Sequence, residues 1–449
     1  MSELSLLQLT PEDQRLTGWV HIGAQLADAE LTALVRPLSG GAVQSFPCCG
    51  NPFVLAPLTN HIDYEIRLRA VCPDGRTVES APRMFRCGFV PGRVIAYQHP
   101  LDDTFAASGR YIGSPSICRA PDGALVASHD FFPGGQNLTH VYRSEDEGQT
   151  WQFASAVTPC FWGSLFEHGG RLYLLATATE YGALVLHESR DGGRTWHGPV
   201  QLLPGGSHEA GGPHKAPMPV LCAAGRIWTG VEFGSWRTKM HCPGAVSAAV
   251  DSDLMDPASW QCTGFLPYDP ERVREVQGMP VGGTIEGNLL QTPDGRLVDL
   301  LRFQTNECTP RYGKAYQVVL DPQHPEALPQ FDRTVDFPGN LSKFFIRRSP
   351  LDGRYYALSN RVTTDALSQR NLLTLSVSDD LIHWTVCRDI LNYADNCFGE
   401  GENQVGFQYP SFIFDGDDLL AVVRTAINGA HNFHDANYMT FHRIRHYRR

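Results

Sequence analysis

Charged and aromatic side chains recur at the ends of short apolar segments from about residue 93 onward. If these segments are paired strands, the start of each first strand and the end of each second strand lie on the same face. The positions at strand ends are His129-Asp130, Glu180-Tyr181, Glu232, Arg302, Arg361 and Arg424. The positions at strand starts include Trp162, His214-Lys215, Glu286 and Gln408-Tyr409. We therefore expect these side chains to line one polar depression.

The arginines indicate what this depression binds. A guanidinium group binds a carboxylate or a sulfate with two hydrogen bonds. A cluster of desolvated guanidinium groups is favourable mainly when it binds an anion. Arg302, Arg361 and Arg424 occupy equivalent positions in successive repeats. We expect these three arginines, together with Lys215, to bind an anionic part of a ligand.

The acidic residues at the same face are the groups that glycoside hydrolysis requires. One carboxyl group protonates the leaving oxygen, while a second one with a lower pKa acts as base or nucleophile. Asp130 or Glu232 would be the acid, and Glu286 would act directly or through a tyrosine. Trp162, Trp236 and Tyr409 are flat surfaces on which sugar rings could stack. The first hypothesis is an exo-acting glycoside hydrolase on an acidic or highly hydroxylated oligosaccharide.

Two other hypotheses fit the same residues. A polysaccharide or oligosaccharide lyase would eliminate across a uronic acid, with His129, His214 or Tyr409 as the base and arginine neutralising the carboxylate. A non-catalytic sugar-binding propeller would use the aromatic and polar contacts alone, because a fold does not fix a function.

The segment from His431 to Tyr438 follows Arg424 on the same face and is dense in polar side chains. His431, His434 and Asp435 have a spacing that could bind a metal, but no helical or finger pattern accompanies them. We therefore expect a hydrogen-bonded loop that lines the pocket, with no metal and no other cofactor.

The elements that position these residues form a sixfold repeat. In each copy an apolar strand runs through a Gly- or Asp-containing turn into a second apolar strand. The first strands of the copies contain Ile117, Phe166, Val220, Leu289, Phe345 and Ile413. The turns lie about 45 to 70 residues apart, the size of a four-stranded blade with its loops. The repeat predicts a six-bladed β-propeller over residues 91–449, closed by pairing of 93–97 with 439–444.

A sharper motif occurs twice within the repeat. Residues 144–151 and 189–196 both match S-x-D-x-G-x-T-W, and residues 378–384 keep its Ser, Asp and Trp. The Ser and Asp side chains can close the hairpin through backbone N–H groups, and the Gly supplies a positive φ. This motif resembles the Asp-box, or BNR repeat, of the sialidase superfamily, where it has a structural role.

The resemblance to the sialidases carries implications for the site. It implies that Glu286 serves a tyrosine nucleophile and that Arg302 is the second arginine of a triad. It also places His129-Asp130 where the loop of the acid aspartate begins. The first triad arginine is missing, because Gly113-Ser114-Pro115 stands where the sialidases have Arg-Ile-Pro. Tyr312 and Tyr316 are the candidates for the nucleophile.

Residues 1–90 are expected to form a separate all-β module. The segments 17–22 and 63–71 alternate polar and apolar residues, as half-buried strands do. The second segment resembles a strand of a fibronectin type III or immunoglobulin-like sandwich. We expect a spacer that packs on the propeller.

The composition limits the partners. A net charge of −11 argues against nucleic acid, whose binding needs a basic stripe. No stretch approaches the roughly 20 apolar residues of a membrane helix. The chain starts without a signal-like segment, and its 12 cysteines are scattered, so a cytoplasmic location is expected. The expected partner is an oligosaccharide substrate, and the oligomeric state is not predicted.

Overall fold

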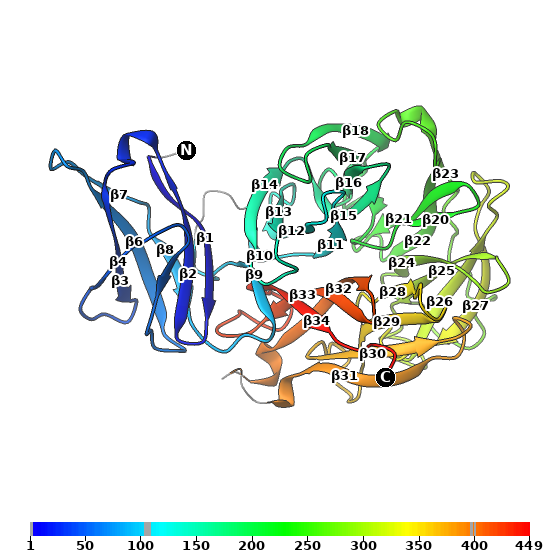
Figure 1. Cartoon of the computed structure of the whole chain (residues 1–449). Helices are drawn as coiled ribbons and strands as arrows, with labels where there is room; N and C mark the ends of the chain where they lie inside the picture. Colours follow the sequence, from blue (N-terminus) through cyan, green and yellow to red (C-terminus); the bar gives the residue numbers. More distant parts are fainter. Residues whose placement is uncertain (1–2, 103–108, 396–397, 399–400) are drawn as a thin grey trace.

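The structure is a computed structural model that describes residues 3–102, 109–395, 398 and 401–449. Within these ranges it is built almost entirely from antiparallel strands (Figure 1). Its described helices are four single 3-10 turns, at Ala24–Leu26, Pro257–Ser259, Tyr393–Asp395 and Glu402–Gln404. The all-β class expected from the sequence is confirmed.

The first two sheets form the N-terminal module, defined here as residues 4–86. One sheet contains β1 (Leu4–Glu12), β2 (Arg15–Ile22) and β5 (Phe53–Leu55). The other contains β3 (Glu30–Pro37), β4 (Gln44–Pro47), β6 (Asp63–Val71), β7 (Thr77–Glu79) and β8 (Arg83–Arg86). Alternate residues of β6 are buried, and they share one core with Leu16 of β2. The alternation expected for 63–71 is thus confirmed.

Six further sheets follow in chain order. The first contains β10 (Gly109–Ile112), β11 (Ser116–Arg119), β12 (Leu125–Gly134), β13 (Thr139–Ser144) and β14 (Gln152–Val157). The second contains β15 (Phe161–His168), β16 (Arg171–Thr177), β17 (Leu184–Ser189) and β18 (His197–Leu203). The third contains β19 (Gly212–His214), β20 (Leu221–Ala223), β21 (Arg226–Ser235), β22 (Met240–Ala249) and β23 (Trp260–Cys262).

The last three sheets have four strands each. The fourth contains β24 (Thr284–Gln291), β25 (Leu297–Phe303), β26 (Lys314–Leu320) and β27 (Gln330–Asp336). The fifth contains β28 (Phe345–Arg348), β29 (Tyr355–Asn360), β30 (Leu372–Ser378) and β31 (Thr385–Asn392). The sixth contains β32 (Gly406–Asp415), β33 (Asp418–Ala426), β34 (Tyr438–Ile444) and β9 (Arg93–Tyr97). As expected, β9 pairs with β34, so a strand from before the first sheet completes the last one.

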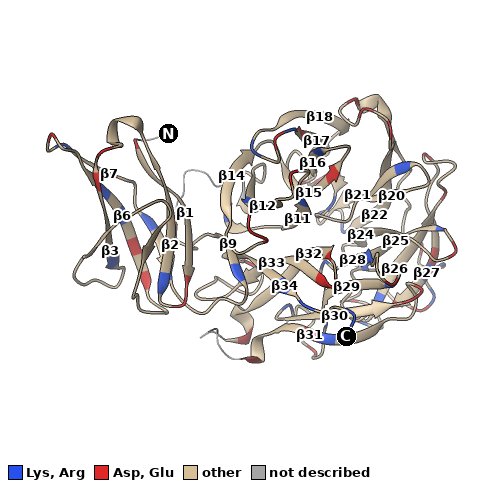
Figure 2. Cartoon of the chain, viewed as in Figure 1, with Lys and Arg blue, Asp and Glu red and all other residues tan. Residues whose placement is uncertain are grey.

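Apolar side chains fill the space between neighbouring sheets. Leu290 and Val298 of the fourth sheet share a cluster with Ile346 and Tyr355 of the fifth. Charged residues of both signs are interspersed over both parts of the molecule (Figure 2). No helix in the described ranges combines the length and the apolarity that a bilayer crossing demands.

The two S-x-D-x-G-x-T-W turns make the same hydrogen bonds. Asp146 accepts from the Ser144 hydroxyl at 2.8 Å and from the backbone N–H of Thr150 at 2.8 Å, and Asp191 accepts from Ser189 and Thr195 in the same way. Gly148 and Gly193 have φ values of +85° and +90°. Trp151 is buried against Phe441 of β34. These turns therefore tie adjacent sheets together, as expected from the motif.

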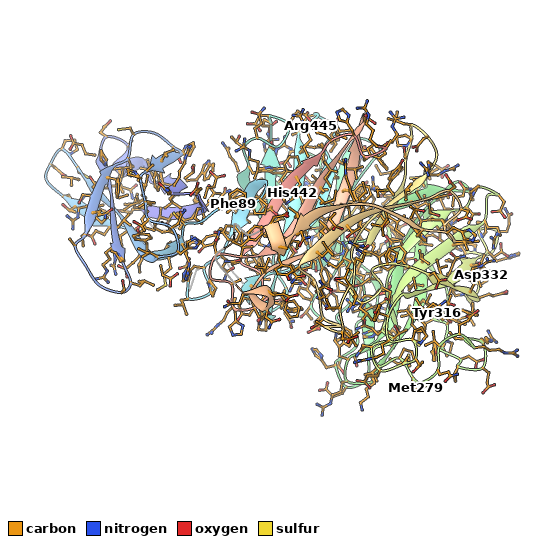
Figure 3. The ribbon with its side chains drawn as sticks, turned by 90° about the horizontal axis from the view of Figure 1, so that it is seen from below. Phe89, Met279, Tyr316, Asp332, His442 and Arg445 are labelled. Carbon is orange, nitrogen blue, oxygen red and sulfur yellow. The ribbon has the colours of Figure 1, made fainter. Side chains whose placement is uncertain are left out.

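The N-terminal module is joined to the larger part by buried polar contacts. The Gln8 side chain donates to the carbonyls of Ile95 at 3.0 Å and Trp151 at 3.1 Å, and it accepts from the N–H of Phe153 at 2.9 Å. Arg83 forms an ion pair of 2.6 Å with Asp102. Phe89 lies between the two parts (Figure 3), and its carbonyl accepts from Asn428.

Candidate functional site

Three β-bulges present side chains at equivalent points of the second, fourth and sixth sheets. Each of β15, β24 and β32 has one residue more than the strand paired with it. The extra residue lies between Phe161 and Ser164 in β15, between Ile285 and Asn288 in β24, and between Gln408 and Ser411 in β32. The extra residue brings a left-handed backbone at Trp162, Glu286 and Tyr409, with φ values of +56°, +58° and +53°. A bulge re-aims its side chain, and a positive φ in a bulky residue marks a position held by its surroundings.

These three side chains meet in one cavity of about 310 Å³, called the central cavity below. Its lining joins residues from five of the six large sheets and their connections. The residues are Ser114, Phe132, Gln136, Phe161, Trp162, Glu180, His214, Trp236, Glu286, Arg302, Gln304, Arg370, Tyr409, Arg424 and His434. Nine of the residues predicted from the sequence are among the charged and aromatic side chains that line it: Trp162, Glu180, His214, Trp236, Glu286, Arg302, Tyr409, Arg424 and His434.

Glu286, Arg302 and Tyr409 form a compact hydrogen-bonded cluster. Arg302 Nη1 donates to Glu286 Oε2 at 2.9 Å and to the Tyr409 hydroxyl at 3.2 Å. The Tyr409 hydroxyl also interacts favourably with the Glu286 carboxylate. Burial alone would raise the pKa of Glu286, but the Arg302 guanidinium and the Tyr409 hydroxyl hold it below its usual value. Glu286 is therefore ionised and placed to accept the phenolic proton.

Two further arginines flank Tyr409. The guanidinium carbon lies 5.8 Å from the centroid of the Tyr409 ring for Arg370 and 5.1 Å for Arg424. Arg370 Nη1 donates to Gln408 Oε1 at 2.9 Å, and Arg424 donates to the backbone carbonyl of His434. Neither forms an ion pair within the described residues, and the Nε of each is buried without a partner there. Burial lowers the pKa of Arg424 to about 10.

Asp130 lies directly beneath the lining. It is 1% exposed, and its two carboxylate oxygens accept from the backbone N–H groups of Ser114 at 2.6 Å and Trp162 at 2.7 Å. Burial raises the pKa of Asp130 to about 6, although these two bonds oppose the shift. Asp130 and Glu286 thus have pKa values displaced in opposite directions.

His214 and Glu232 form a second pair. Nδ1 of His214 lies 2.8 Å from Glu232 Oε2, and Glu232 Oε1 accepts from the N–H of Gly287 in the β24 bulge at 3.1 Å. Only His214 lines the cavity, because Glu232 is 1% exposed. Glu232 therefore orients His214 and supports the bulge that carries Glu286.

An aromatic wall lies on the side of the second and third sheets. The rings of Trp162 and His214 are 4.5 Å apart. Tyr181 is fully buried behind them, and its hydroxyl accepts from the N–H of Trp236 at 3.0 Å. Glu180 accepts from Gln136 at 2.9 Å. Trp236 is 43% exposed at the rim, so its ring is free to contact a ligand.

The loop after β33 closes the cavity on the side of the sixth sheet. Asp435 contacts His431 at 2.9 Å and His434 at 3.0 Å. Hydrogen bonding to these histidines and Asn432 lowers the pKa of Asp435 to about 2 despite burial, and burial lowers the pKa of His434 to about 4. His434 lines the cavity, whereas His431 stacks on Tyr111 outside the lining. The arrangement is the hydrogen-bonded loop expected from the sequence.

Comparisons with known proteins identify the fold. No family model matches the chain, and a search of curated proteins finds no match. Among solved structures, Penicillium chrysogenum α-L-arabinanase complexed with arabinobiose has a TM-score of 0.54 at 14% identity, over 80% of this chain and 98% of the arabinanase. The fold is that of the sialidase-like propellers.

A sialidase and a trans-sialidase match almost the whole chain. A Hadza microbial sialidase has a TM-score of 0.52 at 15% identity, over 99% of this chain and 94% of its own. The leech intramolecular trans-sialidase complexed with 2,7-anhydro-Neu5Ac has a TM-score of 0.52 at 10% identity, over 99% and 92%. Identities this low show a shared fold alone, and the resemblance stated from the turn motif is thereby confirmed.

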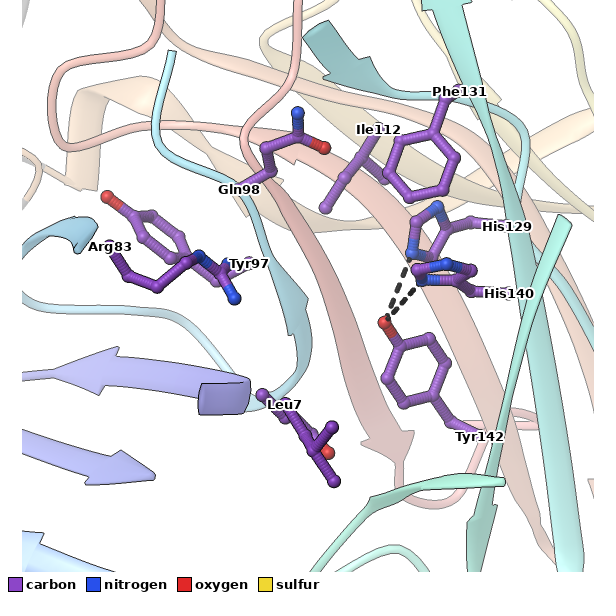
Figure 4. Close-up of a pocket in the computed structure, with 10 residues that line it drawn as sticks. Leu7, Arg83, Tyr97, Gln98, Ile112, His129, Phe131, His140 and Tyr142 are labelled. Carbon is purple, nitrogen blue, oxygen red and sulfur yellow. Dashed lines mark hydrogen bonds between the residues drawn. The ribbon is translucent and has the colours of Figure 1, made fainter. Parts of the chain in front are cut away.

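Several residues chosen from the sequence lie away from the central cavity of this sialidase-like propeller. Arg361 lies outside the lining and pairs with Asp389 of β31 at 3.0 Å. His129 points into a small cavity between the N-terminal module and the first sheet, with His140 and Tyr142 (Figure 4). A position at a strand end predicts that the residue lies near the mouth of the cavity. It does not predict where the side chain points, because successive side chains along a strand point to opposite faces of the sheet.

The two tyrosines proposed as nucleophile are also elsewhere. Tyr312 is 39% exposed outside the lining, and Tyr316 of β26 is buried in an apolar cluster of the fourth sheet (Figure 3). Tyr409, predicted as a binding residue, is the tyrosine that contacts Glu286 and Arg302.

Arg370 and Gln304 are among the lining residues that were not predicted. Arg370 precedes β30, and Gln304 follows β25 directly. Gln304 lies at the end of the second strand of its sheet, where the other residues were located, but it was not chosen. Arg370 precedes the third strand of its sheet, so the rule of first-strand starts and second-strand ends does not reach it. The one available signal is that Arg370 comes directly before an apolar strand of the fifth repeat.

Proposed function

We propose that this protein is a carbohydrate-active enzyme, an exo-acting glycoside hydrolase that releases an acidic sugar from the end of an oligosaccharide. The observation that carries the proposal is the Tyr409 hydroxyl held by Glu286 and Arg302 beneath two further guanidinium groups. A tyrosine paired with a carboxylate supplies a nucleophile, and three arginines supply a site for a carboxylate substituent.

The chemistry follows from these positions. Glu286 takes the phenolic proton as Tyr409 Oη bonds to the anomeric carbon, and the bond to the leaving oxygen breaks while Asp130 protonates that oxygen. Water then attacks the anomeric carbon while Asp130 takes a proton from the water. The bond between the anomeric carbon and Tyr409 Oη breaks, and Glu286 returns the proton to Tyr409. Each displacement inverts the anomeric centre, so the proposed reaction retains configuration.

The electrostatics suit this division of roles. The acid must be protonated and its partner ionised at the same pH, which requires pKa values moved apart. Burial raises the pKa of Asp130 to about 6, and the surroundings of Glu286 lower its pKa. His214, oriented by Glu232, and Trp162 are placed to contact the hydroxyl groups and the face of the sugar.

The comparisons support the class of reaction. The similar structures carry the names arabinanase, sialidase, α-L-arabinofuranosidase and trans-sialidase, and the arabinanase is complexed with arabinobiose. All of these names denote proteins that act on glycosidic linkages. These proteins differ in substrate, so they do not identify the sugar. We propose an acidic sugar because three guanidinium groups, those of Arg302, Arg370 and Arg424, surround Tyr409.

The proposal includes the architecture that holds the site. We interpret the six large sheets as six blades of one propeller around the central cavity, and the N-terminal module as an immunoglobulin-like or fibronectin-like sandwich. Six consecutive sheets of four or five strands and the pairing of β9 with β34 support the first interpretation. Two facing sheets with a shared core support the second.

The test is incubation of the purified protein with a panel of acidic and neutral oligosaccharides, followed by NMR of the anomeric signals. We expect release of a terminal acidic sugar with retention. Tyr409→Phe should lower kcat by about 100-fold or more, while Tyr312→Phe, outside the cavity, should leave it unchanged. An unsaturated uronate product would instead identify a lyase, and binding without turnover would identify a sugar-binding protein.

A further inference from the structure

Two buried lysines lie outside the proposed chemistry. Lys215 follows β19 in the third sheet, Lys343 precedes β28 in the fifth, and they are 1% and 0% exposed. Burial lowers the pKa of each to about 7. An ammonium group is costly to bury unless polar partners replace its water, so their contacts indicate what they are for.

Each ammonium group donates to a backbone carbonyl of a bulge in another sheet, and Lys215 also donates to the carbonyl of the adjacent Ala216 at 2.9 Å. Lys215 Nζ donates to the Trp162 carbonyl at 3.3 Å and to Ser164 Oγ at 2.7 Å, both in the bulged part of β15. Lys343 Nζ donates at 2.6 Å to the carbonyl of Pro410, the residue after Tyr409 in the β32 bulge. In the third bulge, the Asn288 side chain donates to the Glu286 carbonyl at 3.5 Å and to that of Phe344 at 3.3 Å.

These contacts supply hydrogen-bond donors to backbone carbonyl groups that a bulge leaves unpaired. An inserted residue interrupts the ladder and leaves buried carbonyl groups without a strand partner. A proline at position 410 gives the β32 bulge one donor fewer than the others. Trp162 and Tyr409 have φ values of +56° and +53°, which bulky residues adopt only when their surroundings hold them there.

We propose that Lys343 is a positioning residue for Tyr409 and that Lys215 is a positioning residue for Trp162, each acting through the carbonyl that it binds within the bulge. The inference rests on the proposed function, in which Tyr409 performs the chemistry and Trp162 binds the sugar. The two lysines then have different consequences: Lys343 supports kcat, and Lys215 supports substrate binding.

The experiment compares Lys343→Met with Lys215→Met, since Met fills a similar volume without a donor. Each variant serves as the control for the other, because both lysines are buried and both bind a bulge. We expect Lys343→Met to lower kcat by about 10- to 100-fold with little change in KM, as for a misplaced reacting group. Lys215→Met should raise KM by about 10-fold with a smaller effect on kcat.

The outcome that would overturn the inference is a parallel loss in both variants that follows the fall in Tm. Lys343→Arg, which keeps a donor, should recover part of kcat, and failure to do so while the variant is folded would also count against it.

A crystal structure of Lys343→Met separates this inference from the proposed function. We expect Tyr409 to leave the left-handed region or to lose its contact with Glu286, whether or not the protein hydrolyses any substrate tested. If Tyr409 keeps both its φ and that contact, Lys343 does not position it, and the inference is wrong even for an active hydrolase.

Discussion

At the scale of single residues, the site depends on side chains that are almost completely buried. Asp130, Glu286 and Arg302 are 1%, 3% and 3% exposed, so their charges interact through a medium of low dielectric constant. The same burial that raises the pKa of Asp130 leaves Glu286 ionised because Arg302 is in contact with it. The pKa values of one carboxyl group in the cavity and one beneath its lining are thereby moved in opposite directions.

This difference predicts an acidic pH optimum. Activity requires Glu286 ionised and Asp130 protonated, so kcat/KM should rise through the lowered pKa of Glu286 and fall as the pH rises through about 6. Asp130→Asn should remove the alkaline limb and lower kcat/KM by about 10²- to 10⁴-fold. The check is a pH–rate profile of both proteins, and a rate that keeps increasing above neutral pH would contradict Asp130 as the acid.

The arginines give a second prediction at this scale. Arg370→Ala should raise KM for an acidic substrate by about 10- to 100-fold, because a hydrogen bond to a charged group contributes about 1.5–3 kcal/mol. A neutral substrate of the same shape should be affected much less. Arg361→Ala is the matched control in the fifth sheet, since it pairs with Asp389 outside the cavity. Equal effects of the two variants in steady-state kinetics would argue against an anion site at Arg370.

The arginines also show how far the sequence predicts this site. Arg302 and Arg424 lie at strand ends, where the repeat places side chains at the mouth. Arg361 follows β29 at an equivalent position but turns outward, and Arg370 replaces it from a connection. The sequence repeat predicts where each strand begins and ends. It does not predict the path of a connecting loop, because that path depends on packing contacts that do not repeat along the sequence.

At the scale of elements, the bulges decide what the sheets present. β15, β24 and β32 each carry one extra residue at the same place, and each extra residue brings a side chain into the central cavity. The sequence predicted these strands and their turns correctly. It could not predict the bulges. The residue after the inserted one is Gly in two of the bulges and Pro in the third, so no common residue type marks the insertion.

Gly287, beside the extra residue of β24, allows a close approach that any side chain would prevent. A Cβ atom there would lie 2.2 Å from Oδ2 of the buried Asp299. Gly287→Ala should lower the free energy of unfolding by about 1–3 kcal/mol, as overpacking does, and should reduce activity by displacing Glu286. Gly401→Ala, whose Cβ would meet only a side-chain atom at 4.0 Å, is the control. Urea denaturation measures both, and an unchanged midpoint for Gly287→Ala would refute the prediction.

At the scale of the whole molecule, the N-terminal module is joined to the part that carries the site. Gln8 connects β1 to β9 and to Trp151 and Phe153 around β14. Nearby, His129 lies in the cavity between the two parts (Figure 4). Its Nδ1 is 2.9 Å from the carbonyl of Asp130. The interface is therefore one residue away from the proposed acid.

This connection predicts that the two parts unfold together. Gln8→Ala leaves buried partners of β9 and β14 unpaired, at a cost of about 1–3 kcal/mol, and should lower the single Tm of the whole protein. Gln25→Ala, on an exposed position of the same module, should not. Differential scanning calorimetry distinguishes the cases, and two separate transitions, with only one shifted by Gln8→Ala, would show that the parts are independent.

The pairing of β9 with β34 has a consequence for the order in which the chain is made. Residues 93–97 leave the ribosome several hundred residues before their partner at 438–441, which at about 5–20 residues per second is a wait of roughly tens of seconds. An unpaired edge is prone to aggregation during that time. β1 is synthesised earlier and already contacts the Ile95 carbonyl through Gln8. The nascent N-terminal module is thus available to contact this strand before its partner is made.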